Sequence, residues 1–550
     1  MAGRSWLRAL PSLYSAQHAA GRLHPPVIEV GSLVSVGSTI PVIDLFAGPG
    51  GLGEGFSALD RAEGRAAFQI KLSIEKDATA HQTLELRAFF RQFAHGDAPE
   101  DYYEHLRGRL SRRELFDAWP AAADNARREA WHAELGQTSR DEVRRRIHAE
   151  LGNETGWVLI GGPPCQAYST VGRSRNKGRE GYDPQADPRQ YLYVEYLQIL
   201  ADHRPAVFVM ENVKGLLSAT LRDQRIFERI LEDLHAPAVA IRREGRSVHS
   251  SSRLGYRIYS LERSRMFGEC ELEDFVVRAE RHGIPQARHR IILLGIRDDI
   301  SGAPPPALVT REPVPAQVVL EGLPRVRSGI SGRPDLPDAW REIIAGALAE
   351  PWVRALQSNG STDVYEQLVR AIAELRVPRR GRGAEFISGD AQVDFETSWY
   401  LDDRLDGVCN HSTRAHMASD LHRYLFTACF GRARGRSPNL RDFPKRLLPD
   451  HLSVADALDG GNFGDRFRVQ LAGRPSTTIT SHISKDGHYY IHYDPTQCRS
   501  LTVREAARLQ TFPDNYFFCG GRTAQYAQVG NAVPPLMARE IARIVRDVLG

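Results

Sequence analysis

The sequence has no run of about 18 or more uncharged apolar residues, so no segment is predicted to span a bilayer as a helix. It has only six cysteines, and none of them stands in a C-x-x-C pair or beside histidines at the spacing of a zinc site. These absences argue against a disulfide framework and against a bound metal. We therefore expect reduced thiols and a cytoplasmic protein.

Lysine is also scarce, because only six of the 72 basic residues are lysine and the rest are arginine. The guanidinium group suits phosphate and guanine better than an ammonium group does. The formal net charge of +4 is too small to indicate a partner, so the local distribution of charge matters more. A chain of 550 residues is long enough for roughly two to four domains and a large core.

The first 24 residues contain arginine, serine and alanine but no acidic residue, which is the composition of an organellar transit peptide. Such compositional signals are weak, so we favour a plain N-terminal extension. A strand-like run begins at Ile40. The extension is therefore predicted to cover residues 1–39.

Short apolar runs rich in branched residues alternate with helix-compatible segments from Ile40 onward. Each run is followed by glycines or polar residues, as expected for the strands of a parallel sheet. The pattern predicts an α/β fold of the Rossmann-like type, with a doubly wound, mostly parallel sheet. The expected strands lie at 40–46, at 71–77, in a run ending at 95–97, and at 157–166, 206–213 and 290–296.

Composition divides the chain further. Between 101 and 150, arginines alternate with acids around apolar residues at helical spacing, which predicts solvated helices inserted between core strands. A proline-rich stretch near 303 is followed by short mixed segments, which predict a second, smaller domain of mixed structure. The expected organisation is an extension at 1–39, a first domain at 40–302 with the insertion 101–150, a second domain at 303–498, and a helical segment at 499–550 that returns to the first domain.

Gly48, Gly50 and Gly53 follow the first expected strand at the spacing of a dinucleotide-binding loop. Glycines in such a loop let the backbone approach a ligand closely, and the following helix offers its N-terminal amides. Glu75 stands 22 residues beyond Gly53, where an acid is expected to bind ribose hydroxyls. The loop alone does not distinguish among NAD, FAD and S-adenosylmethionine.

Cys165 follows a Gly-Gly-Pro-Pro turn at the end of an expected buried strand, where α/β enzymes hold their ligands. The prolines restrict the turn and would orient the thiol. A thiolate that adds to C6 of cytosine makes C5 nucleophilic, and the addition needs an acid at N3 and a cation at O2. Taken singly, such residues are more often packed thiols, helix caps or surface ion pairs. The candidate acid is Glu211, and the candidate cations are Arg288 and Arg290.

Several motifs occur together in an unpermuted order, and through them the sequence resembles the bacterial-type C5-cytosine DNA methyltransferases. The resemblance covers about residues 40–300 and 499–550. So many ordered motifs would rarely coincide by chance. The motifs are DLFAGPGGLGEGF at 44–56, IEKD at 74–77, GD at 96–97, GGPPCQAYS at 161–169, ENV at 211–213, QARHR at 286–290, RSLTVREAARLQTFPDNY at 499–516 and QVGNAVPP at 528–535.

The resemblance implies methyl transfer from S-adenosyl-L-methionine to C5 of a cytosine flipped out of double-stranded DNA, with S-adenosyl-L-homocysteine as product and no metal. It implies that Cys165 is the nucleophile and that Glu211 binds and protonates N3. Arg290, with Arg288, would hold O2 and the cysteine loop. Glu75 matches the ribose-binding acid and Asp97 the adenine-binding acid. The residues implied around the cofactor are Asp44, Phe46, Gly48, Gly50, Gly53, Glu75, Asp97 and Asn531.

Two further segments fit the same resemblance. Residues 167–190 follow the nucleophile, are rich in glycine and cations, and would close over the target. Residues 303–498 would form the target-recognition domain. Its basic stretch at 422–446 suits phosphate and guanine contacts, and it is interleaved with the aromatic residues Tyr424, Phe426, Phe430 and Phe443.

Other functions remain open at the level of sequence. An RNA cytosine-5 methyltransferase on the same scaffold is one, although the Cys-Phe-Thr segment of that branch is absent. A catalytically silent DNA-binding regulator is another, although Cys165, Glu211 and Arg290 are intact. An NAD-dependent oxidoreductase would explain the glycine loop alone, and amino-group methyltransferases usually carry an aromatic residue after the paired prolines. We expect a monomeric enzyme of a restriction-modification or phage-defence system, with double-stranded DNA and an associated nuclease as partners.

Overall fold

The computed structural model describes residues 39–164, 189–221, 224–249, 254–358, 360–389, 391–450, 453–459 and 464–550. The N-terminal extension up to residue 38 and the expected nucleophile Cys165 lie outside the described residues. So does nearly all of the loop expected to close at 167–190.

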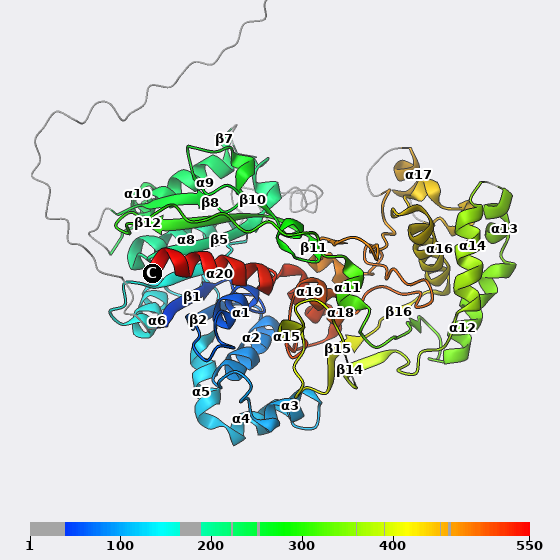
Figure 1. The fold of residues 1–550 in the computed structure, drawn as a ribbon. Coiled ribbons are helices and arrows are strands. Elements are labelled where there is room, and N and C mark those ends of the chain that lie inside the picture. The colour runs from blue at the N-terminus through cyan, green and yellow to red at the C-terminus, as the bar shows by residue number, and fades with distance from the viewer. Residues whose placement is uncertain are drawn as a thin grey trace, which may run out of the picture.

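One large sheet forms the centre of the first half of the chain (Figure 1). Its parallel part has the spatial order β3, β2, β1, β4, β5, and β12 then joins β5 in the antiparallel sense, followed by β8 and β9. The order reverses between β1 and β4, which is where doubly wound folds bind ligands. The strands are β1 (Ile40–Leu45), β2 (Phe68–Glu75), β3 (Ala130–His132), β4 (Val158–Gly161), β5 (Val207–Val213), β8 (Tyr256–Ser260), β9 (Arg265–Met266), β10 (Val276–Arg278), which pairs with β12, and β12 (His289–Arg297).

Helices cover both faces of this sheet, so the predicted doubly wound α/β fold is confirmed. Residues of β1 alternate between two cores: Ile43 and Leu45 pack on one face, and Ile40 and Val42 on the other. Both faces are buried, which explains why the strands are almost wholly apolar. The first face carries α6 (Arg140–Leu151), α8 (Arg189–His203), α9 (Ile226–His235) and α10 (Pro237–Arg243), and the second carries α1 (Gly51–Ala58) and α20 (Pro535–Leu549).

The segment between β2 and β4 differs from the sequence-based expectation. The run ending at 95–97 is not a strand, because α2 (Ala78–Arg91) occupies it and a turn follows. Helices do fill the predicted insertion, but their inner faces form a core of their own around Tyr102 and Phe116. The third parallel strand, β3, lies inside the insertion. The insertion contains α3 (Glu100–Leu106), α4 (Arg112–Ala118), α5 (Pro120–Glu129), β3 and α6.

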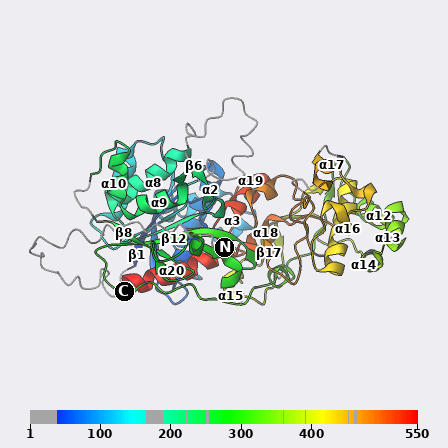
Figure 2. The same ribbon diagram turned by 90° about the horizontal axis from the view of Figure 1, so that it is seen from above.

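A second lobe, mainly helical, stands apart from the sheet in both views (Figures 1 and 2). Its core is packed around Trp340, Trp352 and Tyr424. The aromatic residues of the basic stretch 422–446 are all buried in this core, so they are not exposed platforms for bases. The lobe contains α12 (Pro337–Ala345), α13 (Pro351–Ser358), α14 (Thr362–Ala373), α16 (Ala418–Arg434) and α17 (Ser453–Leu458).

Short elements and the C-terminal helices join the two lobes. Buried ion pairs fix this junction: Arg499 donates to both oxygens of Glu505, and Arg508 to both oxygens of Asp514. The elements of the junction are β11 (Gln286–Ala287), α11 (Ala316–Leu320), β13 (Gly329–Ile330), β14 (Gly383–Ser388), α15 (Thr397–Tyr400), β15 (Gly407–Ser412), β16 (Ala415–His416), β17 (Ser476–Thr477), α18 (Val503–Leu509) and α19 (Arg522–Asn531). Two further short strands, β6 (Thr220–Leu221) and β7 (Gln224–Arg225), pair with each other between β5 and α9 in the first lobe.

The described part of the chain can be examined for disulfide bonds and for helices that could span a membrane. Its five cysteines form no disulfide bond. Among its helices, none is both long and apolar enough to cross a membrane.

Candidate active site

A cavity of about 370 Å³ opens at the carboxyl ends of β1, β2, β4 and β5. These four strand ends bring together motifs that are far apart in the sequence, and α19 closes the opposite side. The wall residues are Asp44, Phe46, Ala47, Gly48, Pro49, Gly51, Leu52, Ile74, Glu75, Lys76, Asp77, Ala80, Ala133, Leu135, Gly162, Pro163, Pro164, Leu192, Glu211, Asn212, Val213, Ala524, Ala527, Gln528, Asn531, Ala532 and Val533.

The glycine loop is bound directly to the acid at the end of β2. The Gly48 N–H donates to Glu75 Oε2 (2.8 Å), and the Asp77 N–H donates to Glu75 Oε1 (2.7 Å). Each carboxylate oxygen has further lone pairs, so Glu75 can still accept hydrogen bonds from ligand hydroxyl groups. This geometry fits a ribose, as the spacing of the two motifs predicts.

Gly50 and Gly53 do not line the cavity; they allow the loop to pack closely. Gly50 has φ of 96°, and a Cβ there would lie 2.8 Å from a methyl group of Leu84. A Cβ on Gly53 would lie 3.1 Å from Asp44 Oδ2. Only glycine combines a positive φ with the absence of a Cβ that position 50 requires, and any larger residue at position 53 would crowd the Asp44 carboxylate on the cavity wall.

Asp44 is the most unusual polar group in the cavity. It is 1% exposed, and neither of its carboxylate oxygens accepts a hydrogen bond of good geometry from the described residues, although the backbone of Gly53 lies close to the carboxylate. Burial raises its pKa to about 8, and the nearby charge of Arg91 and the Gly53 backbone offset only part of that effect. A buried polar group without a partner is costly, so a bound ligand that supplies a polar partner would be favoured here.

The opposite wall comes from the end of α19. Asn531, Ala532 and Gln528 face the cavity, and Phe46, with φ of 56°, lies in the loop that follows β1. The sequence analysis identified Phe46 and Asn531. It did not identify Gln528 and Ala532, although both lie in the QVGNAVPP motif.

Asp97, the expected adenine-binding acid, is not on the cavity wall. It is exposed in the turn after α2. Ala133 and Leu135, directly after β3, take the corresponding place, because β3 pairs with β2 in parallel and brings His132 beside Glu75. Ala133 and Leu135 could not be predicted from the sequence, because β3 is only three residues long and lies among charged helical segments.

The other end of the cavity holds a carboxylate and a guanidinium. Glu211 lies on the wall, and Arg290 Nε is 2.9 Å from its Oε1. β12 runs antiparallel to β5 and pairs Ile292 with Glu211, so Arg290, two residues earlier, points to the same face. The Nη2 group of Arg290 has no partner among the described residues and is free to reach a ligand oxygen.

The turn that leads to Cys165 is packed against this pair. A Cβ on Gly161 would lie 2.2 Å from the Leu45 carbonyl, and one on Gly162 would lie 2.7 Å from the Glu211 carbonyl. Asn212 Nδ2 donates to the Pro163 carbonyl at 3.3 Å. The two glycines and the amide therefore hold the start of the cysteine loop against the carboxylate.

Arg288 lies behind the site and does not line the cavity. It is 2% exposed, and Nη1 donates to the Ile479 carbonyl (2.7 Å) and the Gly530 carbonyl (3.4 Å). Burial and the charge of Arg290 lower its pKa well below the usual range. The structure thus assigns Arg288 contacts that tie the QARHR segment to α19, and it shows no contact with a ligand site.

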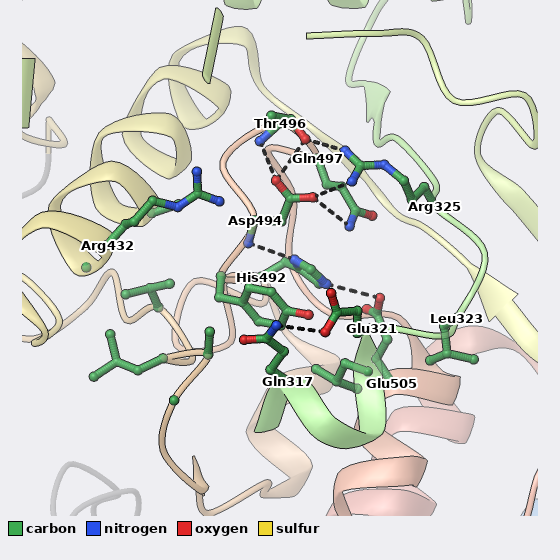
Figure 3. Close-up of a pocket in the computed structure, with 18 of the residues that line it drawn as sticks. Gln317, Glu321, Leu323, Arg325, Arg432, His492, Asp494, Thr496, Gln497 and Glu505 are labelled. Atoms are coloured by element: carbon green, nitrogen blue, oxygen red, sulfur yellow. Dashed lines mark hydrogen bonds and ion pairs between the residues drawn. The ribbon is translucent and has the colours of Figure 1, made fainter. Parts of the chain in front are cut away.

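A larger cavity of about 800 Å³ lies where α11, α16 and residues 492–497 meet (Figure 3). Two of its four acids are paired with arginines: Asp494 with Arg325 at 3.0 Å, and Glu505 with Arg499. His492 stands between these acids, and burial lowers its pKa to about 4. We regard this cavity as part of the junction between the lobes.

Comparison with known proteins agrees with this geometry. The sequence model of the family described as C-5 cytosine-specific DNA methylase matches residues 120–237 and 271–546. The chain is 32% identical to the type II methyltransferase M.Bpa9945I of Bacillus paralicheniformis over 92% of this chain and 99% of that one. It is 28% identical to the type II methyltransferase M.AgeI of Thalassovita gelatinovora, over 92% and 98% of the two chains. It is 27% identical to the DNA (cytosine-5-)-methyltransferase M.ApeKI of Aeropyrum pernix, over 71% and 81%.

Proposed function

The chain belongs to the C-5 cytosine-specific DNA methylase family, and we propose that it methylates C5 of a cytosine rotated out of duplex DNA, through a covalent adduct with Cys165. It is a DNA (cytosine-5-)-methyltransferase. The observation that carries the detailed proposal is that one cavity holds Asp44 and Glu75 at one end and Glu211, paired with Arg290, at the other.

The reaction needs a nucleophile because C5 of cytosine does not attack a methyl donor unaided. The Cys165 thiolate forms a bond to C6, and the ring electrons shift toward N3 and O2. Glu211 gives a proton to N3, and Arg290 donates a hydrogen bond to O2, so negative charge does not accumulate on the ring. C5 then takes the methyl group. A base such as water removes the C5 proton, the thiolate leaves C6, and N3 returns its proton to Glu211.

The protein orients these groups through the contacts of the cysteine turn. Glu211 is held by its ion pair with Arg290, and Pro163 is held by Asn212, so the turn that precedes the nucleophile is fixed beside the acid. Arg288 acts as a positioning residue, since its guanidinium ties the strand that carries Arg290 to α19.

S-adenosyl-L-methionine fits the other end of the cavity and supplies an electrophilic methyl group when bound. Glu75 would accept hydrogen bonds from its ribose, and Asp44 would gain the polar partner that it lacks. Ala133 and Leu135 would pack against the adenine, and Asn531 would contact the amino acid portion from α19. Asp97 has no part in this arrangement.

Duplex DNA must deliver the base by flipping. In a stacked helix, neighbouring bases cover both faces of cytosine, so a thiolate and a methyl donor cannot approach from opposite sides. Unstacking costs a few kcal/mol, which contacts to the DNA backbone offset. We therefore assign residues 303–498, which include the second lobe, to target recognition.

Two of the relatives are named type II methyltransferases, which supports a role beside a restriction or defence nuclease. In such a pair, methylation of one sequence protects host DNA from cleavage. The product S-adenosyl-L-homocysteine would leave the same cavity after each transfer.

Bisulfite sequencing of DNA from cells that express the protein tests the proposal. The wild-type protein should protect cytosines in one sequence context from conversion, and Cys165→Ser should protect none while still binding S-adenosyl-L-homocysteine. Protection by Cys165→Ser would remove the covalent adduct from the mechanism. Matched RNA and DNA oligonucleotides assayed side by side separate a DNA enzyme from an RNA enzyme.

A further inference from the structure

Three arginines gather at the beginning of α19, outside the cavity already described. Arg382 precedes β14, Arg414 lies between β15 and β16, and Arg522 is the first residue of α19. Arg382 Nη2 donates to the Thr413 carbonyl at 3.1 Å, and Arg522 Nη1 donates to the same carbonyl. The Arg414 guanidinium stacks 4.5 Å from the ring of Tyr526, one turn along the helix from Arg522. We call Arg382, Arg414 and Arg522 the arginine triad.

No member of the arginine triad forms an ion pair with a carboxylate of the described residues. Their hydrogen bonds go to backbone carbonyls, since Arg414 binds those of Ile483 (2.7 Å) and Lys485 (2.9 Å). The nearby acid Glu385 accepts hydrogen bonds from Asn410 and Gln525 instead. Most other half-buried arginines of this protein have a carboxylate partner, so three neighbouring cations without one are exceptional.

The local electrostatics also favour an anion. Burial and the charges of Arg382 and Arg414 lower the pKa of Arg522. The first turn of α19 contains no acidic residue, and its N-cap, Gly521, provides no side-chain cap, so the positive end of the helix dipole adds to the same field. The Nε groups of Arg382 and Arg414 are buried without a hydrogen-bond partner in the described structure. The triad thus gathers three positive charges that no ion pair in the described structure neutralises, and the carboxylate of Glu385 offsets only part of the field at Arg522.

The arginine triad is close to the candidate active site. Ala524, Ala527 and Asn531 of the same helix line the cavity, and nine residues separate Arg522 from Asn531. At a rise of 1.5 Å per residue, that distance is about 14 Å, or about four nucleotide steps of 3.4 Å along one DNA strand. The triad therefore lies at the end of the helix that forms one wall of the cavity, and a separation of this size is within the span of a duplex bound over that cavity.

We propose that the arginine triad is an anion site that binds a phosphate of the DNA backbone near the target nucleotide. The proposal rests on the proposed function, because it assumes that the flipped base enters the cavity. Guanidinium groups bind phosphate oxygens through paired N–H donors, and such contacts fix the register of the duplex without reading its sequence.

The experiment compares wild-type protein with Arg522→Gln, Arg522→Lys and a matched control, Arg113→Gln. Arg113 is a 91% exposed arginine of α4 paired with Asp117, so its removal changes the net charge equally. Binding to a mixed-sequence duplex is measured by fluorescence anisotropy over a range of salt concentrations. Arg522→Gln should weaken binding several-fold and reduce the slope of log affinity against log salt by about 0.9, the value for one phosphate. Arg522→Lys should keep most of the slope, and Arg113→Gln all of it.

Two further measurements keep the outcomes separate. Binding of S-adenosyl-L-homocysteine, measured by calorimetry, should be unchanged in Arg522→Gln, which shows that α19 is intact. A wild-type slope in Arg522→Gln would overturn the proposal. If inorganic phosphate stabilises the wild-type protein but not Arg522→Gln while the DNA slope is unchanged, the site takes a free anion and the assignment to DNA is wrong. Absence of cytosine methylation with a reduced slope would refute the proposed function alone.

Discussion

Replacing Gly162 by alanine should damage catalysis without unfolding the protein. The new Cβ would lie 2.7 Å from the Glu211 carbonyl oxygen and 3.0 Å from its Oε2, whereas ordinary contacts begin at 3.4 Å. The Glu211 backbone lies between β4 and β12 in the middle of the sheet and yields little. The cysteine turn must therefore move by about 0.7 Å. Misplacement of reacting groups on this scale costs roughly 10- to 100-fold in rate, or about 1.4–2.7 kcal/mol of transition-state stabilisation.

The assay is single-turnover transfer of a radiolabelled methyl group to DNA, together with calorimetric titration of S-adenosyl-L-homocysteine. Gly162→Ala should lose rate but keep its affinity for the product. Gly215→Ala is the matched control, since its Cβ would meet only a methyl group of Val213 at 4.0 Å. A rate for Gly162→Ala equal to that of the wild type would refute the argument that this glycine sets the distance between the turn and the acid.

Two further predictions concern buried charge. Asp44→Asn should weaken cofactor binding at least several-fold. It should also raise the free energy of unfolding of the ligand-free protein by up to about 4 kcal/mol at neutral pH, since the folded carboxyl has its pKa raised from 3.8 to about 8. Calorimetry should find Asp97→Asn unchanged in both quantities, and a loss of cofactor affinity equal to that of Asp44→Asn would show that Asp97 belongs to the cofactor site. Burial lowers the pKa of His411 and His492 from 6.5 to about 4, so the unfolded chain binds more protons below pH 6.5 and stability should fall as the pH drops from about 6.5 to about 4. At pH 5 each histidine should cost about 2 kcal/mol in urea unfolding, and an unchanged transition between pH 8 and pH 5 would contradict this.

The strands of the sheet could be predicted because each is buried on both faces. β1 and β5 consist almost wholly of apolar residues until the polar or glycine residues at their ends, so the sequence marks both the strand and the place of the site. β3 offers no such signal, because three residues between charged helices carry no periodicity. For this reason the sequence analysis placed the expected adenine-binding acid at Asp97, which is not on the cavity wall, and did not identify Ala133 and Leu135, which are.

The pairing of Glu211 with Arg290 illustrates what spacing cannot show. The two residues are 79 positions apart in the sequence, and their motifs indicate only that both belong near a ligand. They meet because β12 runs antiparallel to β5, at the place where the parallel part of the sheet ends. Arg288 is two residues before Arg290 and was assigned a similar role from its motif. It points away from the cavity wall and binds backbone carbonyls instead.

The basic stretch 422–446 shows a different limit. Interleaved aromatic and basic residues are typical of nucleic-acid interfaces, but α16 turns Tyr424, Phe426 and Phe430 into the core of the second lobe, and Phe443 joins them from the segment after the helix. Several of its cations then find partners inside the protein: Arg434 pairs with Asp363 and Arg436 with Asp442. The arginine triad could not be found in this way, because its members are distant in sequence and none stands in a basic run. A cluster of charge in the sequence therefore does not show which cations remain unpaired in the structure.

The insertion between β2 and β4 has a structural part in the site that its charged sequence does not suggest. Tyr103 of α3 donates to Asp402 Oδ2 at 2.8 Å, and Asn515 Nδ2 donates to the same oxygen at 2.7 Å. Asn515 in turn accepts from Arg87 of α2, whose Nε donates to Glu54 of α1, the helix that follows the glycine loop. A continuous chain of hydrogen bonds thus connects the helix of the glycine loop with the C-terminal segment and the insertion. Because buried charged groups are costly when a partner is removed, a change at any member of this chain should disturb the cavity as well as the insertion.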